Sequence, residues 1–593
     1  MSTAVSYRIR PVSPEAHLFE VSTTVLQPAV SGQVLRLPAW IPGSYMIREF
    51  ARHIVSIRAE SGSKAVALTK LDKHSWQAAP VKGALTVHYT VYAFDLSVRG
   101  AYLDGERGFY NGTSVFLQAD GFENEPCEVE ILPPQDKALA KWQVATSLPA
   151  LEVKKSGFGS YLAANYDELI DHPVELGEFE RVTFKACGVP HEFIVSGKYK
   201  ADLKRLAADT KRICEWQIRF FGEPAPFDRY VFMLFVGGDI YGGLEHRAST
   251  ALVASRDDLP QQGEAGISDG YLKLLGLISH EYFHTWNVKR MKPAAFTPYD
   301  LNREGHTTLL WAFEGITSYY DDLALVRSGL IDEQRYLGLL AKTITGVARG
   351  NGRNKQTLAD SSFDAWSKYY RQDENSPNSI VSYYTKGSLA ALALDLHIRK
   401  HSHGSMSLDT VMQALWQKWL SDGKGLAEDE WERVAEQVTG LKLGKFFDMA
   451  IRSTRELPLA ELLATQGVEM QLVPADGASD GGSVVETIVP ASVRPTLGVK
   501  TASDAQGVKL TAVLDGGAAQ AAGLSGGDVV IAVNGVRVSD LDKALRRYRV
   551  GDGLKLHAFR RDELLSFRVT LQGMPADTCR LRLEENGGSW IKG

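Results

Sequence analysis

Cysteine is scarce in this chain. Its four cysteines, Cys127, Cys187, Cys214 and Cys579, stand far apart and match no zinc-ligand or redox spacing. We expect them to be small buried apolar residues in a reducing compartment. The cysteine pattern therefore indicates neither a metal site nor a redox motif.

Long apolar runs and an excess of basic residues are also missing. No stretch reaches about 18 apolar residues, so no membrane span is predicted. The first residues show no apolar segment behind a basic one, so no secretory signal is expected. We therefore expect a cytoplasmic protein, or a periplasmic one if a signal has been removed. The net charge of −5 argues against a general nucleic-acid binder.

The composition is that of a globular protein, and the 593 residues are enough for several domains. Short β-branched and aromatic segments separated by Gly, Pro and Asp turns predict an N-terminal β domain, sandwich-like, over residues 1–185. Residues 186–465 are predicted to start as mixed α/β and become mostly helical. We expect a linker at 466–489, a module of short strands and one helix at 490–575, and a loosely ordered polar tail at 576–593.

The segment H-E-Y-F-H (280–284) lies in a predicted helix over 271–290. His280 and His284 are one turn apart on one face, so both imidazoles can reach the same ion. Glu281 lies beside that face, where it can act on a water as a general base. This H-E-x-x-H pattern predicts a zinc site, although it also arises by chance in a long chain.

A catalytic zinc needs a third protein ligand. Glu314 stands in an otherwise apolar helical stretch, W-A-F-E-G-I (311–316), where a carboxylate without a partner would be unfavourable to bury. Together with the two histidines, Glu314 gives the two-His, one-Glu set of a catalytic zinc site. The alternative is a glutamate on the exposed stripe of an amphipathic helix.

H-E-x-x-H followed by W-x-x-E-G is the gluzincin arrangement of the aminopeptidase N family. In that family the spacing from the second histidine to the glutamate is shorter than the spacing from His284 to Glu314 in this chain. The segments at 284–290, H-T-W-N-V-K-R, and 314–320, E-G-I-T-S-Y-Y, resemble the glycyl aminopeptidase family of bacterial zinc peptidases. So do W-I-P-G-S-Y-M-I-R-E-F (40–50) and Y-A-F-D-L-S-V-R (92–99), so the resemblance covers nearly the whole chain. It implies a thermolysin-like catalytic domain with one zinc ion. It also implies an enzyme that removes the N-terminal residue of peptides and prefers glycine, then alanine, at that position.

One position departs from thermolysin-type sites. An aspartate four residues after the ligand glutamate would orient the first histidine, but Ser318 stands there. Asp321 or Asp322, about one turn further along, could take this part, and the sequence leaves the choice open.

An aminopeptidase must also hold a free α-ammonium group. G-G-L-E-H (242–246) resembles the G-A-M-E-N motif of the aminopeptidase N family and could form an edge strand. Gly242 and Gly243 would let a peptide approach closely, and Glu245 would face its amine. The alternative is a glycine hairpin with a surface glutamate, and His246 is as readily structural as functional.

V-S-Y-Y-T-K-G (381–387) contains Y-x-K-G, which resembles the catalytic tyrosine motif of the same relatives. It points to Tyr384 as a donor to the oxyanion of the tetrahedral intermediate, with Tyr383 as a competing assignment. Either tyrosine could instead be a core aromatic residue.

T-L-G-V (496–499), followed by A-A-G-L-S-G-G-D-V-V-I-A-V-N-G (521–535), resembles a PDZ domain. Leu497, Gly498 and Val499 would form the loop that binds the carboxylate of a C-terminal peptide. The alternative is a domain that only packs against the catalytic body.

The leading interpretation is a zinc aminopeptidase acting on peptides with a free N-terminus. Two alternatives remain open: a metalloendopeptidase that receives substrates through its PDZ domain, and a PDZ scaffold with a vestigial metal site. The first would cleave blocked peptides without needing Glu245. An intact set of ligands and base argues against the second.

Overall fold

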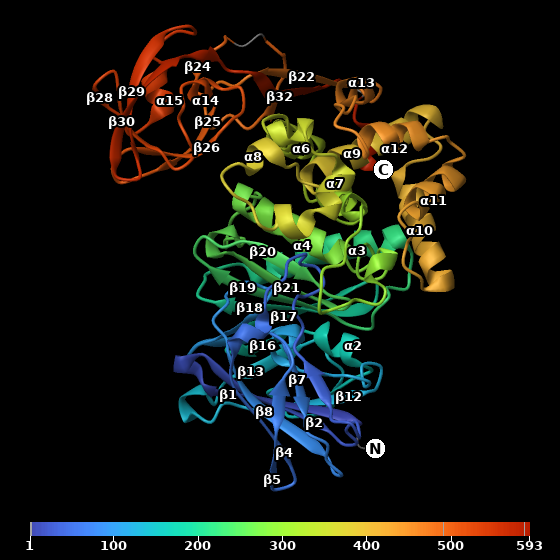
Figure 1. Ribbon diagram of the computed structural model, residues 1–593. Helices are drawn as coiled ribbons and strands as arrows, with labels where there is room; N and C mark the ends of the chain where they lie inside the picture. The colour runs from blue at the N-terminus through green and yellow to red at the C-terminus, as the bar shows by residue number, and fades with distance from the viewer. Residues whose placement is uncertain (1–2, 490–491, 586) are drawn as a thin grey trace. The chain divides into compact units, whose positions relative to one another are not determined.

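The computed structural model (Figure 1) describes residues 3–489, 492–585 and 587–593. The chain divides into two compact units, Met1–Gly305 with Gly423–Gly425, and His306–Asp422 with Leu426–Gly593. The predicted domain limits at residues 1 and 490 lie outside the described residues. Across the described ranges, no helix is long and apolar enough to cross a membrane.

The first unit begins with three β-sheets, which confirms the predicted N-terminal β domain. The largest has the order β14-β15-β12-β1-β2-β8-β4-β5. In β1 and β8 every second residue is buried, as expected for a sheet with one face on the core. Its strands are β1 (Val5–Ser13), β2 (Leu18–Val25), β4 (Ile54–Ser61), β5 (Lys64–Val66), β8 (Leu85–Tyr92), β12 (Cys127–Ile131), β14 (Ala150–Val153) and β15 (Gly159–Ala163).

Two four-stranded sheets complete this β-rich part, which is blue to cyan in Figure 1. One contains β13 (Gln143–Thr146), β16 (Val174–Gly177), β10 (Arg107–Tyr110) and β9 (Ala101–Leu103), in that order. The other contains β11 (Gln118–Ala119), β3 (Val34–Arg36), β7 (Ser75–Ala78) and β6 (Leu68–Lys70).

A five-stranded mixed sheet follows in the same unit and carries part of the site. Its order is β17 (Glu180–Ala186), β18 (Val189–Gly197), β19 (Tyr230–Gly237), β21 (Ser249–Ser255) and β20 (Gly242–Glu245). β18, β19 and β21 run parallel, and β19 is an almost continuous apolar run, as a strand covered on both faces should be. β20 pairs antiparallel with β21 at the edge, so the expected edge strand is confirmed.

Two expectations for this region were wrong in detail. Residues 182–185 were expected in the N-terminal β domain, but they lie in β17 and pair with β18 of the mixed sheet. The helix expected over 271–290 is α4 (Asp269–Phe283), which ends at His284. Beyond it the chain turns sharply, with Met291 N–H donating to the Trp286 carbonyl at 2.9 Å. Helix α3 (Leu203–Phe221) packs beside α4.

The second unit is mostly helical as far as residue 464. Helix α9 (Thr385–His401) has buried residues on almost every side, as expected for the core helix of a helical body. Its other helices are α5 (Ile316–Arg327), α6 (Glu333–Ala348), α7 (Leu358–Phe363), α8 (Ser376–Ser379), α10 (Leu408–Asp422), α11 (Glu430–Thr439), α12 (Gly444–Ala450) and α13 (Leu459–Ala464).

The segments expected as a linker and a loose tail are structured. β22 (Val468–Pro474), β32 (Ala576–Leu583) and β23 (Ser483–Val484) form one small sheet. β32 buries Cys579 and Leu581 completely, and Trp590 of α16 (Ser589–Lys592) is also fully buried. The polar composition of the tail had hidden the alternation C-R-L-R-L, which is typical of a half-buried strand.

Between these segments lies the predicted PDZ module with its own apolar core. Its main path of strands is β25 (Val499–Ser503), β26 (Val508–Val513), β27 (Val529–Val533), β29 (Gly553–Arg560) and β30 (Glu563–Thr570). β28 (Val536–Arg537) pairs with β27, and β24 (Pro495–Thr496) pairs with β31 (Gln572–Gly573). Its helices are α14 (Ala518–Ala521) and α15 (Leu541–Leu545).

Candidate active site

The two histidines lie at the C-terminal end of α4. The helix starts at an N-cap, Ser268, whose Oγ accepts from Tyr271 N–H at 3.1 Å. Near its other end, the Nε2 atoms of His280 and His284 lie 3.0 Å apart. Carbonyl groups without helical partners make this end of a helix favourable for a cation.

The contacts of His284 fix the proton on its ring. Its Nδ1 lies 2.7 Å from the carbonyl oxygen of Asn287. Since a carbonyl only accepts, Nδ1 carries the proton, and Nε2 of the neutral ring keeps its lone pair. This is the arrangement of a histidine prepared to bind a metal ion, and it depends on the turn that follows α4.

Glu314 lies in a π-helical turn, Trp311–Gly315, directly before α5, and it is only 2% exposed. Such turns are frequent at functional sites because they shift one side chain out of the regular helix. Gly315 packs against Gly387 of α9 so closely that a Cβ on Gly315 would lie 2.6 Å from the Gly387 Cα. The glycines of E-G and K-G therefore bring Glu314 close to the start of α9.

His280, His284 and Glu314 form a candidate metal site: one ligand atom of each lies within 4.8 Å of the others. Imidazole nitrogens and a carboxylate oxygen are donors that zinc accepts, and two histidines with one glutamate leave a position open. The residues present therefore fit a catalytic zinc ion by their donor chemistry.

Two further carboxylates gather at His284. Ligand atoms of Glu245, Glu281 and His284 also lie within 4.8 Å of one another, and all three residues are buried. A Cβ on Gly243 in β20 would lie 2.1 Å from Glu281 Oε1, so this strand passes directly over the Glu281 carboxylate. The edge strand and the end of α4 thus place two acidic groups close together.

The N-terminal β domain also contributes to this region. A Cβ on Gly43 would lie 2.5 Å from Glu245 Oε1, and the φ of +92° at Gly43 is one that glycine adopts readily. Arg99 donates from Nη2 to the carbonyl of Gly243 at 3.2 Å. Neither residue had been assigned a role from the sequence, although both lie in segments that resemble the family, 40–50 and 92–99.

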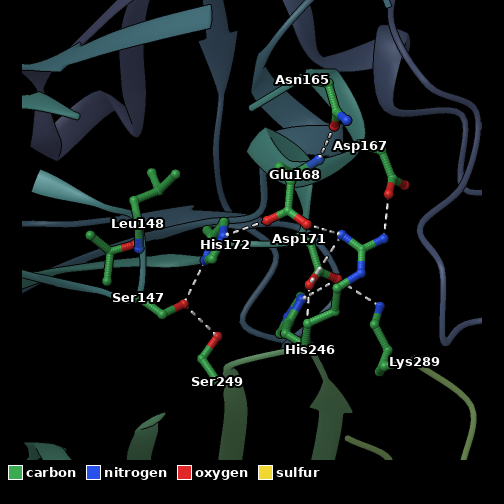
Figure 2. A network of polar contacts seen from close by, with 12 residues as sticks. Ser147, Leu148, Asn165, Asp167, Glu168, Asp171, His172, His246, Ser249 and Lys289 are labelled. Atoms are coloured by element: carbon green, nitrogen blue, oxygen red, sulfur yellow. Dashed lines mark hydrogen bonds and ion pairs between the residues drawn. The ribbon is translucent and has the colours of Figure 1, made fainter. Parts of the chain in front are cut away.

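A buried polar network links the strand of Glu245 to the segment after His284 (Figure 2). At its centre is Asp171, which follows α2 (Tyr166–Ile170). One carboxylate oxygen lies 2.7 Å from Lys289 Nζ, and the other accepts from Arg247 N–H at 2.8 Å. Burial alone would raise the pKa of Asp171, but the charges of Lys289 and then Arg247 hold it well below its usual range.

His246 belongs to the same network. Its Nδ1 lies 3.6 Å from a carboxylate oxygen of Asp171, and burial lowers the pKa of its ring to about 4. The ring is therefore neutral at physiological pH. Asp171 lies 76 residues from Arg247 in the sequence, so no local pattern could have indicated this contact.

Four tyrosines form a cluster in the second unit. Tyr384 stacks on Tyr369, and the ring of Tyr383 lies tilted against Tyr369. The hydroxyl groups of Tyr370 and Tyr384 lie 3.4 Å apart. Tyr383 is fully buried, whereas Tyr384 is partly exposed. Burial, and next the charge of Glu314, raises the pKa of Tyr384, so its hydroxyl keeps its proton.

The predicted carboxylate loop of the PDZ module lies where β25 begins. Leu497 is buried in the module's core, Gly498 has a φ of +71°, and Val499 is the first residue of β25. β25 is the first strand in the order of its sheet, which is the position expected of a strand that a peptide could extend.

Sequence profiles of three families match the chain. They are the peptidase M61 N-terminal domain at residues 6–178, the M61 glycyl aminopeptidase at 273–390, and the PDZ domain at 495–571. None of the curated proteins compared with the chain matches it.

Solved structures were compared with the chain as well. The crystal structure of an aminopeptidase N family protein from Idiomarina loihiensis is 41% identical, covers 99% of both chains and superimposes with a TM-score of 0.95. An M1 zinc metallopeptidase from Deinococcus radiodurans is 15% identical over 77% of this chain and 93% of its own, with a TM-score of 0.48. The profiles and the 41% identical structure bear out the expected metallo-aminopeptidase with its candidate His-His-Glu site. The chain belongs to the M61 glycyl aminopeptidase family and carries that family's N-terminal domain and a PDZ domain.

Proposed function

We propose that this chain is a zinc-dependent aminopeptidase that removes the N-terminal residue of peptides, with glycine preferred and alanine second. The observation that carries the proposal is the set of His280, His284 and Glu314 within 4.8 Å. The preference for glycine is supported by the family to which the chain belongs. One zinc ion per chain would be held by these three residues.

A bound zinc ion supplies a Lewis acid, which makes water more acidic and polarises the carbonyl of the substrate. Glu281 then takes a proton from the attacking water and passes it to the leaving amine. This role is supported by the place of Glu281, which is buried beside His280 on α4 and lies under the backbone of Gly243.

Glu245 receives the α-ammonium group of the substrate. The peptide would pair with β20, where Gly242 and Gly243 leave room for its backbone, so that cleavage falls one residue from the amine. Support comes from the position of β20 at the sheet edge and from the closeness of the Glu245 and Glu281 carboxylates. An ammonium group suits such a concentration of negative charge.

Tyr384 donates a hydrogen bond to the oxyanion that forms during attack. Its partial exposure supports this choice over the fully buried Tyr383. Tyr370, whose hydroxyl lies 3.4 Å from that of Tyr384, would hold the Tyr384 hydroxyl in place.

The loop of Leu497, Gly498 and Val499 would bind the C-terminal carboxylate of a peptide partner.

A cytoplasmic location is supported by the cysteines, all four of which are unpaired, as in proteins of reducing compartments.

The test compares 4-nitroanilides of glycine, alanine and leucine with N-acetylglycine 4-nitroanilide, for the natural enzyme and for Glu281→Gln and Glu245→Gln. We expect cleavage of the free glycyl and alanyl substrates only, near-complete loss in Glu281→Gln, and a raised KM in Glu245→Gln. Equal cleavage of the acetylated substrate would refute the aminopeptidase and favour an endopeptidase. No cleavage by a zinc-loaded enzyme would favour a scaffold.

A further inference from the structure

Asn378 joins the PDZ module to the helical body of its own unit by two hydrogen bonds. Asn378 of α8 donates from Nδ2 to the Val513 carbonyl at 2.8 Å and accepts at Oδ1 from Asp515 N–H at 2.9 Å. The side-chain amide of Asn378 thus bonds both a carbonyl and an N–H group of the backbone at the end of β26, as the backbone of a neighbouring strand would. Asn378 is only 3% exposed, so both bonds are shielded from water.

Other contacts hold the same loop. Asn351 donates from Nδ2 to the Asp515 carbonyl at 3.2 Å, and Lys355 forms an ion pair with the Asp515 carboxylate. Nearby, Gly526 packs against the stem of Glu374, where a Cβ on the glycine would lie 2.8 Å from the Glu374 Cγ. The loop at 513–515 is therefore held to the helical body by Asn378, Asn351 and Lys355.

Asn378 lies six residues before Tyr384, and the chain between them has little freedom. The carbonyl oxygen of Ile380 lies close to Gly352, because a Cβ on Gly352 would be 1.9 Å from it. Val381 N–H donates to Gln356 Oε1 at 2.9 Å, and the Val381 carbonyl accepts from Ser361 at 2.5 Å.

The last step to the tyrosine is also bonded. Tyr384 N–H donates to Ser382 Oγ at 3.2 Å, at the start of α9. The segment from Asn378 to Tyr384 is therefore held by contacts at Ile380, Val381 and Tyr384.

The same loop also touches the predicted carboxylate loop of the PDZ module. Leu514 N–H donates to the Gly498 carbonyl at 2.9 Å, and Ala519 N–H donates to the Leu497 carbonyl at 2.8 Å. Gly498 and Gly517 are so close that a Cβ on Gly498 would lie 2.9 Å from the Gly517 Cα. One continuous set of contacts therefore runs from the carboxylate loop to Asn378.

We propose that Asn378 is a positioning residue, through which the PDZ module sets the place of the Tyr384 hydroxyl and with it the rate of peptide hydrolysis. The proposal rests on the role given to Tyr384 above. A displacement of about 1 Å at a catalytic group can lower a rate by roughly 10²-fold. Loss of the Asn378 contacts is therefore expected to lower kcat and to leave KM, which reflects binding of the amine, nearly unchanged.

The test is a double-mutant cycle in the full-length enzyme with glycine 4-nitroanilide. In the natural background, Asn378→Ala should lower kcat about tenfold, with KM within about twofold. In Tyr384→Phe, which lacks the hydroxyl to be positioned, the same change should lower kcat by less than about twofold. Asn534→Ala is the matched control, because the Asn534 amide also pairs as donor and acceptor, but within the PDZ module. It should leave kcat unchanged.

The outcomes separate the inference from the proposed function. If Tyr384→Phe has the kcat of the natural enzyme, the role of Tyr384 is wrong and the inference falls with it. If Tyr384→Phe is impaired but Asn378→Ala has no effect, or an equal effect in both backgrounds, the inference alone is overturned. If Asn378→Ala does not fold, Lys355→Met replaces it, because this change removes the exposed ion pair with Asp515 in the same loop. The same cycle with Tyr384→Phe then applies, and we expect kcat to fall two- to threefold in the natural background.

Discussion

Gly43→Ala should weaken binding of the substrate amine without touching the chemistry. A Cβ at this position would lie 2.5 and 2.7 Å from the two carboxylate oxygens of Glu245, so the carboxylate must move. A hydrogen bond to a charged group contributes about 1.5–3 kcal/mol. Its loss corresponds to a fall in kcat/KM of roughly 10- to 150-fold for glycine 4-nitroanilide, carried mainly by KM.

The control for this substitution is Gly121→Ala. Gly121 has a φ of +86°, close to the +92° of Gly43, and its Cβ would meet no atom within 4 Å. Both variants carry the backbone strain of a left-handed residue, about 1–2 kcal/mol, but only one displaces Glu245. Equal kinetics of the two variants, at equal thermal stability, would refute the reasoning.

The remaining predictions concern the base and the buried network. Gly243→Ala places a Cβ 2.1 Å from Glu281 Oε1, so kcat should fall about 10²-fold, whereas Gly238→Ala, in open space, should not change kcat. Asp171→Asn leaves Lys289 buried without its charged partner and should lower the free energy of unfolding, measured by urea titration, by about 3–5 kcal/mol. Adding Lys289→Met to this variant should recover part of the loss. No recovery would contradict the pairing of Asp171 with Lys289. Since the pKa of Asp171 is depressed in the folded chain, its contribution is present above pH 3.8 and lost as pH falls toward the folded pKa, so unfolding of Asp171→Asn should depend less on pH below 3.8.

The sequence was most informative where function depends on neighbours in the chain. His280, Glu281 and His284 are brought together by a single helical turn, so their spacing alone predicted the arrangement. The edge strand of Glu245 was also predictable, because glycines follow a buried apolar strand. The PDZ module was evident from its glycine turns and alternating strands.

Contacts between distant segments could not be predicted in this way. Arg99 and Gly243 are 144 residues apart, and nothing in either segment indicates the other. The end of α4 at Phe283 depends on Asn287, whose carbonyl turns back to His284. β32 was missed because arginines on its outer face concealed the apolar residues between them.

The most direct test of the account measures bound zinc and peptidase activity together. The enzyme is stripped with a chelator, and zinc is returned in steps while hydrolysis of glycine 4-nitroanilide is followed, with Glu314→Gln alongside. The account predicts that activity disappears on stripping and returns in proportion to zinc up to one ion per chain, and that Glu314→Gln binds zinc weakly and stays inactive. Full activity of the metal-free enzyme, or unchanged zinc binding in Glu314→Gln, would contradict it.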